Sequence, residues 1–220
     1  MNAVLIEPAR LPELAARMGV TLSEPQTALL LQYLALIQKW NKVYNLTALR
    51  DPAEMFTHHL LDSLAAVVPL QKHLAANGKE QGCLLDVGSG AGLPGVVFAI
   101  CCPGLQVSCV DTVGKKAAFV QQAAVELGLR NLRGVHARVE TLSGPFDVVS
   151  SRAFASLVDF TSWSKLALAA DGVWLAMKGK NPVEEVAALP STVTVFHVEQ
   201  LTVPGLDAER CIVWMRASVA

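Results

Sequence analysis

The sequence predicts an α/β protein with a seven-stranded, mostly parallel sheet, covered by helices on both faces and preceded by a helical extension. From residue 83 onward, short apolar runs alternate with segments of helical periodicity, which is the pattern of a parallel sheet. Before residue 81 the apolar side chains recur at helical spacing, as at Leu30, Leu34 and Ile37. We therefore expect an N-terminal helical extension at residues 1–80, packed on an α/β domain at residues 81–220.

The extension contains two predicted helix starts. Ser23–Gln26 reads SEPQ and has the form of a capping box, and Asp51–Glu54 reads DPAE, with an N-cap residue before proline. The second helix is expected to end at Pro69, and Asn77–Gly82 is expected to link the extension to the sheet. The apolar stripe of that second helix consists of Phe56, Leu60, Leu64 and Val67.

Seven segments of the α/β domain have the length and β-branched character of strands. They are residues 83–87, 106–111, 132–137, 146–151, 173–178, 192–198 and 210–216. Helices are expected at residues 94–101, 114–127, 157–169 and 182–189. A short PGLD turn, rather than a helix, joins the last two strands, so the final pair is expected to be antiparallel.

The composition is that of a globular protein in a reducing compartment. Of the 220 residues, 52% are hydrophobic and 17% charged, and the apolar runs fall short of the ~20 residues that span a bilayer. The five cysteines form no C-x-x-C pair, which favours buried thiols over a disulfide framework or a metal site. We expect a cytoplasmic protein with no membrane partner. The net charge of −1 does not indicate a nucleic-acid partner, so a polyanion would need a local basic patch.

A glycine-rich loop follows the first predicted strand, in the segment Leu84–Gly95 (LLDVGSGAGLPG). Its glycines allow positive φ and close approach of the backbone to a ligand at the carboxyl end of the sheet. The pattern Gly90-x-Gly92-x-x-Gly95 also satisfies the dinucleotide fingerprint. Asp111, at the end of the second strand, can bind ribose hydroxyls in either case. The loop alone therefore does not distinguish a nicotinamide dinucleotide from S-adenosylmethionine.

Three further features favour the methyl donor and a class I methyltransferase fold. Asp86 lies inside the strand, where methyltransferases carry an acid near the donor's cationic end; bracing of the loop is the alternative role. Val139 and Glu140 follow the third strand, where these enzymes contact adenine. Both tyrosines, Tyr33 and Tyr44, precede the nucleotide fold, so it contains no Tyr-x-x-x-Lys dyad for hydride transfer. A nicotinamide oxidoreductase is the less favoured chemistry.

The fourth strand ends in VVSSRAF, at the place where acceptor-side residues are expected. The segment has neither the [DN]-P-P-[YF] motif used for exocyclic amines nor a cysteine nucleophile. A lone-pair acceptor such as a purine N7 needs neither, only in-line placement against the methyl group. We therefore assign no general base and expect Arg152 to position the acceptor or the donor. His58 and Asp62, four residues apart in the extension, are expected to form a solvated pair.

Several stretches together resemble the bacterial ribosomal RNA small-subunit methyltransferase G family, also called glucose-inhibited division protein B. The resemblance covers nearly all of residues 20–216. The stretches that carry it are Lys39–Met55 (KWNKVYNLTALRDPAEM), His59–Leu64 (HLLDSL), Leu84–Gly95, Asp111–Lys116 (DTVGKK), Ala137–Glu140 (ARVE), Ser151–Leu157 (SRAFASL) and Met177–Lys180 (MKGK). This resemblance implies S-adenosylmethionine-dependent methylation of N7 of a guanine in 16S ribosomal RNA, near the decoding region.

The residues and the resemblance together give a candidate site. Three positions depart from the family pattern, His58 in place of arginine, Val97 in place of proline and Cys211 in place of histidine, and none is assigned a functional role. The expected cofactor-binding residues are Asp86, Gly88, Gly90, Leu93, Asp111, Val139, Glu140 and Arg152. The candidate RNA contacts are Lys39, Lys42, Arg50, His59, Lys178 and Lys180.

The expected partner is small-subunit ribosomal RNA, within an assembled or partly assembled subunit, bound by a monomer. No metal is expected, and the product of the donor is S-adenosylhomocysteine. Two alternatives remain: a small-molecule methyltransferase on the same fold, and a non-catalytic rRNA-binding assembly factor. The basic extension counts against the first, and the second would not need the intact donor loop.

Overall fold

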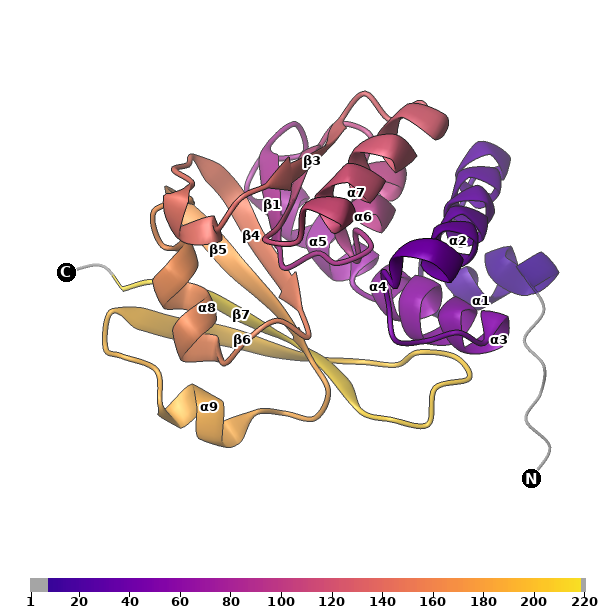
Figure 1. The fold of residues 1–220 in the computed structure, drawn as a ribbon. Helices are drawn as coiled ribbons and strands as arrows, with labels where there is room; N and C mark the ends of the chain where they lie inside the picture. Colours follow the sequence, from indigo (N-terminus) through magenta and orange to yellow (C-terminus); the bar gives the residue numbers. More distant parts are fainter. Residues whose placement is uncertain (1–7, 219–220) are drawn as a thin grey trace.

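The computed structural model describes residues 8–218 and contains the predicted seven-stranded sheet (Figure 1). The strand order is β3-β2-β1-β4-β5-β7-β6, with β7 antiparallel to both of its neighbours and the other pairs parallel. This confirms the expected fold class and the antiparallel final pair. The strands are β1 (Cys83–Val87), β2 (Gln106–Asp111), β3 (Leu132–His136), β4 (Phe146–Arg152), β5 (Leu168–Lys178), β6 (Val193–Leu201) and β7 (Arg210–Ala217).

Helices cover both faces of the sheet, as the alternation of strands and helices predicts. In the extension lie α1 (Leu11–Arg17), α2 (Glu24–Tyr44), α3 (Pro52–Met55), α4 (Asp62–Leu64) and α5 (Val67–Ala76). The α/β domain adds α6 (Gly95–Cys101), α7 (Gly114–Glu126), α8 (Leu157–Ser164) and α9 (Val183–Ala187). Three short helical segments complete the described chain: η1 (Pro8–Arg10), the π-helix η2 (Phe56–Leu61) and η3 (Val139–Thr141).

The extension shares one hydrophobic core with the face of the sheet that α6 and α7 cover. Leu30 and Ile37 of α2 belong to the same buried cluster as Phe98 of α6 and Phe119 of α7. A second cluster lies on the opposite face, under α8 and α9. In Figure 1 the N-terminal helices accordingly lie beside α6 and α7 and away from α8 and α9.

The long helix α2 forms as its sequence predicts. Ser23 accepts a hydrogen bond from the backbone N–H of Gln26, and the Gln26 side chain accepts one from the Ser23 backbone, so the predicted capping box is confirmed. The helix ends at Tyr44, and its C-cap Asn45 has a left-handed φ of 50°. Midway along α2, the buried Tyr33 hydroxyl donates a 2.6 Å hydrogen bond to the Ala91 carbonyl of the glycine-rich loop. The extension thus contacts the predicted ligand loop directly.

The second helix of the extension differs from the prediction. Its N-cap Asp51 and its buried apolar stripe are confirmed, but the helix passes through a π-helical turn, and α5 continues past Pro69 to Ala76. The predicted end at Pro69 was wrong because this proline lies in the first turn of α5, where a backbone N–H has no intrahelical acceptor to lose. The π-helix carries both His58 and His59.

One boundary in the α/β domain also differs. The helix expected at residues 157–169 ends at Ser164, and β5 already begins at Leu168. The Ser164 hydroxyl donates to the Phe160 carbonyl and accepts a hydrogen bond from the Trp174 indole of β5. This buried polar pair ties the end of α8 to the sheet, and apolar periodicity alone cannot reveal it.

Candidate active site

The glycine-rich loop connects β1 to α6 at the point where the strand order reverses, between β1 and β4. In open α/β sheets ligands bind at such switch points, outside the carboxyl ends of the strands. Gly88, Gly90 and Gly92 have φ values of +64°, +58° and +88°, so the loop needs residues without a Cβ. The backbone N–H groups of Gly88 and Ser89 both donate to the Val110 carbonyl, which holds the loop against β2.

Asp86 of β1 is buried under this loop and stabilises its conformation, which is the bracing role considered from the sequence. It is fully buried, one carboxylate oxygen accepts from the Gly95 backbone N–H at 2.9 Å, and the other accepts from the Ser150 hydroxyl at 2.9 Å. Ser150 is its register partner on β4, so strand pairing sets the second contact. Burial raises the pKa of Asp86 to about 7, against the lowering effect of the two hydrogen bonds and of Arg152. These contacts match the bracing role better than direct contact with a donor.

The raised pKa of Asp86 predicts a pH-dependent stability. The unfolded chain releases this proton near pH 3.8, whereas the folded chain holds it until about pH 7. Burial therefore lowers the free energy of unfolding as the pH rises between these values, by up to about 1.4 kcal/mol per pH unit. The variant Asp86→Asn lacks this titration. The free energy of unfolding of this variant, relative to that of the wild type, should rise from pH 4 to pH 7 and stay constant above pH 7, as measured by urea unfolding. If the free energies of unfolding of the two proteins change with pH in parallel, the prediction is contradicted.

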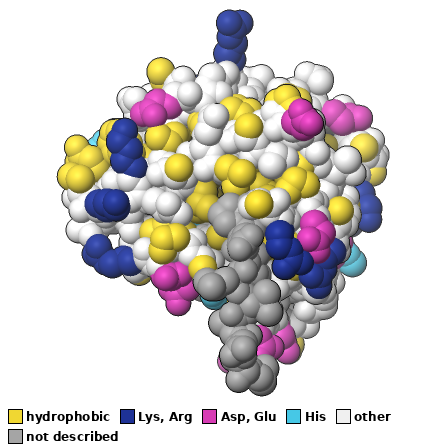
Figure 2. Space-filling view, turned by 90° about the vertical axis from the view of Figure 1, so that its right-hand side faces the viewer, with side chains coloured by type: hydrophobic (Ala, Val, Ile, Leu, Met, Phe, Trp, Pro, Cys, Tyr) yellow, Lys and Arg dark blue, Asp and Glu magenta, His cyan; other side chains and the backbone are white. Residues whose placement is uncertain are grey.

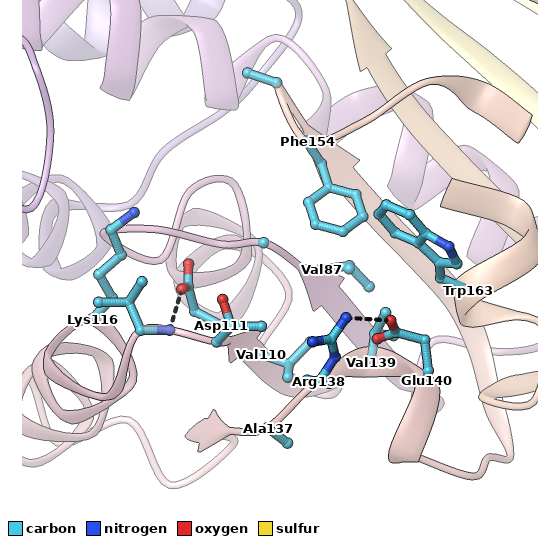
Figure 3. Close-up of a pocket in the computed structure, with 14 residues that line it drawn as sticks. Val87, Val110, Asp111, Lys116, Ala137, Arg138, Val139, Glu140, Phe154 and Trp163 are labelled. Carbon is cyan, nitrogen blue, oxygen red and sulfur yellow. Dashed lines mark hydrogen bonds and ion pairs between the residues drawn. The ribbon is translucent and has the colours of Figure 1, made fainter. Parts of the chain in front are cut away.

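A cavity of about 370 Å³ opens beside the loop, at the carboxyl ends of β1, β2 and β4, and its size suits a small-molecule ligand. Figure 3 shows Phe154 and Trp163 on one side, Val110, Arg138 and Val139 on the other, and Asp111 with Lys116 at one end. We call it the donor cavity. Its lining residues are Val87, Gly88, Val110, Asp111, Thr112, Val113, Lys116, Ala137, Arg138, Val139, Glu140, Ala153, Phe154 and Trp163.

Asp111 is held in place for a polar ligand. One of its oxygens accepts from the Gly90 N–H at 3.0 Å and the other from the Val113 N–H at 2.8 Å. A carboxylate has about four acceptor positions, so these two bonds leave room for two hydroxyl donors. At the opposite end Val139 is buried, and Glu140 forms an ion pair with Arg138. The cavity therefore combines a polar end at Asp111 with an apolar slot between Val139 and the rings of Phe154 and Trp163, and the ion pair lies at the edge of this slot.

Of the eight predicted cofactor residues, four line the donor cavity: Gly88, Asp111, Val139 and Glu140. The other four lie elsewhere. Gly90 donates its N–H to Asp111, Leu93 is buried in the core, Asp86 is buried under the loop and Arg152 lines a neighbouring cavity.

The aromatic wall of the cavity was not predicted. Phe154 lies over the loop so closely that a Cβ on Gly88 would fall 2.2 Å from its ring, and Trp163 meets Phe154 edge-to-face at 5.9 Å. Phe154 belongs to the quoted SRAFASL stretch, so its position was visible in the sequence. Trp163 lies on α8, and no local pattern marks it.

A second cavity of about 380 Å³ adjoins the first, and Ala153 lines both. We call it the acceptor cavity. The extension and the α/β domain both contribute to its lining, which consists of Leu49, His58, His59, Asp62, Arg152, Ala153, Met177, Lys178, Gly179 and Arg210. Because the two cavities share this residue, groups bound in them could approach each other at Ala153.

Two arginines from different strands share one buried carboxylate in the acceptor cavity. Arg152 of β4 bonds Asp62 at 2.7 Å and Arg210 of β7 bonds its other oxygen at 2.8 Å, while Arg152 also donates to the His58 carbonyl. The predicted solvated pair of His58 and Asp62 was therefore wrong. The cause is tertiary: Asp62, 4% exposed, faces the sheet, and two permanent cations compensate its charge there. In the sequence, Asp62 is an acidic residue on an otherwise apolar stretch of helix, and this is the signal that it needs a buried cationic partner.

His59 is held as a neutral side chain at the same cavity. Its Nε2 lies 2.8 Å from the Thr47 hydroxyl, and Nδ1 is buried without a hydrogen-bond partner among the described residues. Burial, aided by the charge of Arg152, lowers the pKa of His59 to about 4. Lys178 also lines the cavity, with its ammonium bonded to the Ala155 carbonyl and the Glu185 carboxylate.

A comparison with protein-family models shows to which family the chain belongs. The model of the rRNA small subunit methyltransferase G family matches residues 26–213. The chain belongs to this family. The resemblance stated from the sequence is thereby confirmed, and the chain is an rRNA methyltransferase.

Close relatives carry the same family name. A ribosomal RNA small subunit methyltransferase G from Acidovorax sp. (strain JS42) is 70% identical over 211 residues, which cover 94% of this chain and 93% of the relative. The one from Paracidovorax citrulli (strain AAC00-1) is 69% identical and covers 92% of this chain and 86% of its own.

Solved structures share the fold at low identity. A SAM-dependent methyltransferase from Aquifex aeolicus superposes with a TM-score of 0.54 at 16% identity, over 78% of this chain and 96% of that one. A 1,6-didemethyltoxoflavin-N1-methyltransferase from Burkholderia thailandensis, solved with S-adenosylhomocysteine, gives 0.55 at 17% identity, over 90% and 92% of the two chains. These similarities confirm the class I methyltransferase fold of the family member described here.

The other predicted RNA contacts are exposed and line neither cavity. Lys39, Lys42 and Arg50 are exposed at the end of α2 and in the loop that follows it, and Lys180 lies in the loop after β5. Within residues 8–218, no helix is long and apolar enough to cross a membrane, and no three His, Cys, Asp or Glu side chains form a metal-binding group. All five cysteines are free, and four of them are buried.

Proposed function

We propose that the chain transfers the methyl group of S-adenosylmethionine to N7 of a guanine in 16S ribosomal RNA of the small subunit. The observation that carries the proposal is the adjacency of the two cavities at the switch point of the sheet, which share Ala153. One can hold the donor and the other the base, with the reacting atoms meeting between them. Family membership supports ribosomal RNA as the acceptor.

The donor cavity fits S-adenosylmethionine, which would supply an electrophilic methyl group on a sulfonium. Asp111 would accept from the two ribose hydroxyls, and the apolar slot at Val139 would hold the adenine, with Glu140 at its edge. Gly88, whose backbone lines the cavity under Phe154, would let the ligand approach the chain closely. Asp86 would act through the loop that it braces.

The acceptor cavity needs to position a base and to move no proton. N7 of guanine carries a free lone pair, so the N–C bond forms as the S–C bond breaks, and the positive charge moves with the methyl group. The chain's contribution is in-line placement, which is proximity and orientation. Arg152 and Arg210 are fixed by Asp62 and would donate to the acceptor. The low pKa of His59 keeps its ring neutral at physiological pH, so it would not repel the methylated, cationic base.

The form of the RNA partner follows from the charge of the protein. The overall charge of −1 argues for a folded RNA or a pre-assembled subunit, recognised by shape, with an unpaired base turned into the site. We propose that a cytoplasmic monomer acts on it, with Lys39, Lys42 and Arg50 among its phosphate contacts. A metal ion has no role in this proposal.

The proposal is tested by offering the protein labelled S-adenosylmethionine together with small subunits that lack the modification, bare 16S rRNA or small molecules. Label in 7-methylguanosine from the subunits or the rRNA is expected. The variant Asp111→Ala should weaken donor binding by about tenfold or more, because it loses two hydrogen bonds to a charged acceptor. Label in small molecules alone would favour a small-molecule methyltransferase on the same fold. Tight donor binding without transfer to any RNA would favour the assembly factor.

A further inference from the structure

The last turn of α2 exposes two large hydrophobic side chains next to each other. Val43 is 71% exposed and Tyr44 is 41% exposed. Exposed apolar side chains are common singly, and aromatic side chains are enriched at interaction surfaces relative to the rest of a protein surface. We call Val43 and Tyr44 the α2 platform.

The Tyr44 ring is held in a fixed orientation. It stacks on Trp40, one turn earlier in α2, with ring centroids 5.1 Å apart and an angle of 30° between the ring planes. Trp40 in turn packs edge-to-face on the fully buried Phe119 of α7, at 5.6 Å. A ring supported in this way loses little conformational freedom when a flat ligand stacks on it.

Exposed cations lie beside the platform at two positions. Lys39 lies one turn before Val43 on the same side of α2, and it forms no ion pair or side-chain hydrogen bond within residues 8–218. Lys42, two residues before Tyr44, projects from the opposite side of the helix. Arg50 lies near Tyr44, because its guanidinium donates to the side-chain oxygen of Asn45, the next residue, at 2.9 Å. Figure 2, viewed from the side of the N-terminal helices, shows hydrophobic side chains spread over that side of the molecule, with Lys and Arg mainly towards its margins. Positive charge beside an exposed aromatic ring is the surface that single-stranded RNA binds.

The loop after the platform leads directly to the acceptor cavity. Asn41 fixes this loop from α2: its amide donates to the Leu49 carbonyl, and its side-chain oxygen accepts from the Thr47 N–H, both at 2.9 Å. Leu49 lines the acceptor cavity, and Thr47 bonds His59, which also lines it. The platform and the cavity are therefore the two ends of one ordered loop.

We propose that the α2 platform stacks an unpaired base of the RNA substrate that neighbours the target nucleotide, with Lys39 and Arg50 on the adjacent phosphates. This inference rests on the proposed RNA acceptor. A base splayed onto Tyr44 would leave the target nucleotide unstacked on that side, which favours its entry into the acceptor cavity.

The test compares two platform variants with a matched control in steady-state methylation of 16S rRNA. Tyr44→Leu should raise KM for the RNA about tenfold with little change in kcat, as loss of one base–aromatic stack would. Tyr44→Phe keeps the ring and should stay within about twofold of wild type. Phe196→Leu removes a ring that is 42% exposed, on the far edge strand β6, and should leave KM unchanged.

The salt dependence of RNA binding separates stacking from charge. Tyr44→Leu should weaken binding at every salt concentration without changing the slope of log K against log salt. Lys39→Gln should lower that slope by about one. S-adenosylhomocysteine affinity, measured calorimetrically, should be unchanged in both variants, which also shows that they are folded. An unaltered RNA KM in Tyr44→Leu would overturn the platform while leaving the proposed function intact. A wild type that methylates no RNA would overturn the proposed function instead.

Discussion

Alanine at Gly88 is expected to weaken S-adenosylmethionine binding by at least about tenfold. A Cβ at this position would fall 2.2 Å from the Phe154 ring, so the ring would have to move, and Phe154 walls the donor cavity. The φ of +64° adds roughly 1–2 kcal/mol of backbone strain for alanine. Isothermal titration calorimetry with the donor or its product measures the loss.

A matched glycine separates these two effects. Gly78 has the same φ of +64°, but no atom lies within 4 Å of the Cβ position. Gly78→Ala should therefore show the backbone strain alone, as a lower urea midpoint with unchanged donor affinity. If Gly88→Ala binds the donor as tightly as Gly78→Ala does, close approach at Gly88 plays no part in binding.

The second large effect is expected at Asp62. Asp62→Ala removes the carboxylate that two arginines share, and breaking a buried ion pair leaves uncompensated charge. The Arg152 and Arg210 side chains are 17% and 21% exposed, so solvent relieves part of this cost, and we expect a loss of about 2–3 kcal/mol in the free energy of unfolding. Methyl transfer should fall at least tenfold, because small displacements of positioning groups cost about that much or more.

A surface ion pair provides the control for this variant. Glu13 pairs with Arg10, and both side chains are well exposed. Glu13→Ala should leave both the urea midpoint and methyl transfer nearly unchanged. Donor affinity should survive in Asp62→Ala, since Asp62 lines only the acceptor cavity. If transfer stays at the wild-type rate in Asp62→Ala, the two arginines do not position the acceptor.

Local patterns predicted the sheet and the donor loop well. The alternation of strands and helices gave the seven strands, and Asp86 with its glycines marked the switch point, because these signals lie within single elements. The acceptor cavity was less predictable. Arg210 is far from Asp62 and Arg152 in the sequence, and only the pairing of β5 with β7 brings it to them. Trp163 was missed for the same reason, since its role depends on where α8 lies against the sheet.

The shared lining of the acceptor cavity has a consequence for how this enzyme can change. His59 and Asp62 come from the extension, whereas Arg152 and Arg210 come from the sheet, and the Tyr33 hydroxyl ties the same extension to the donor loop. The extension is therefore not an interchangeable recognition module attached to a self-sufficient catalytic domain. Replacing it would remove four of the ten residues that line the acceptor cavity, together with a support of the donor loop, so under the proposed function substrate choice and catalysis evolve as one unit.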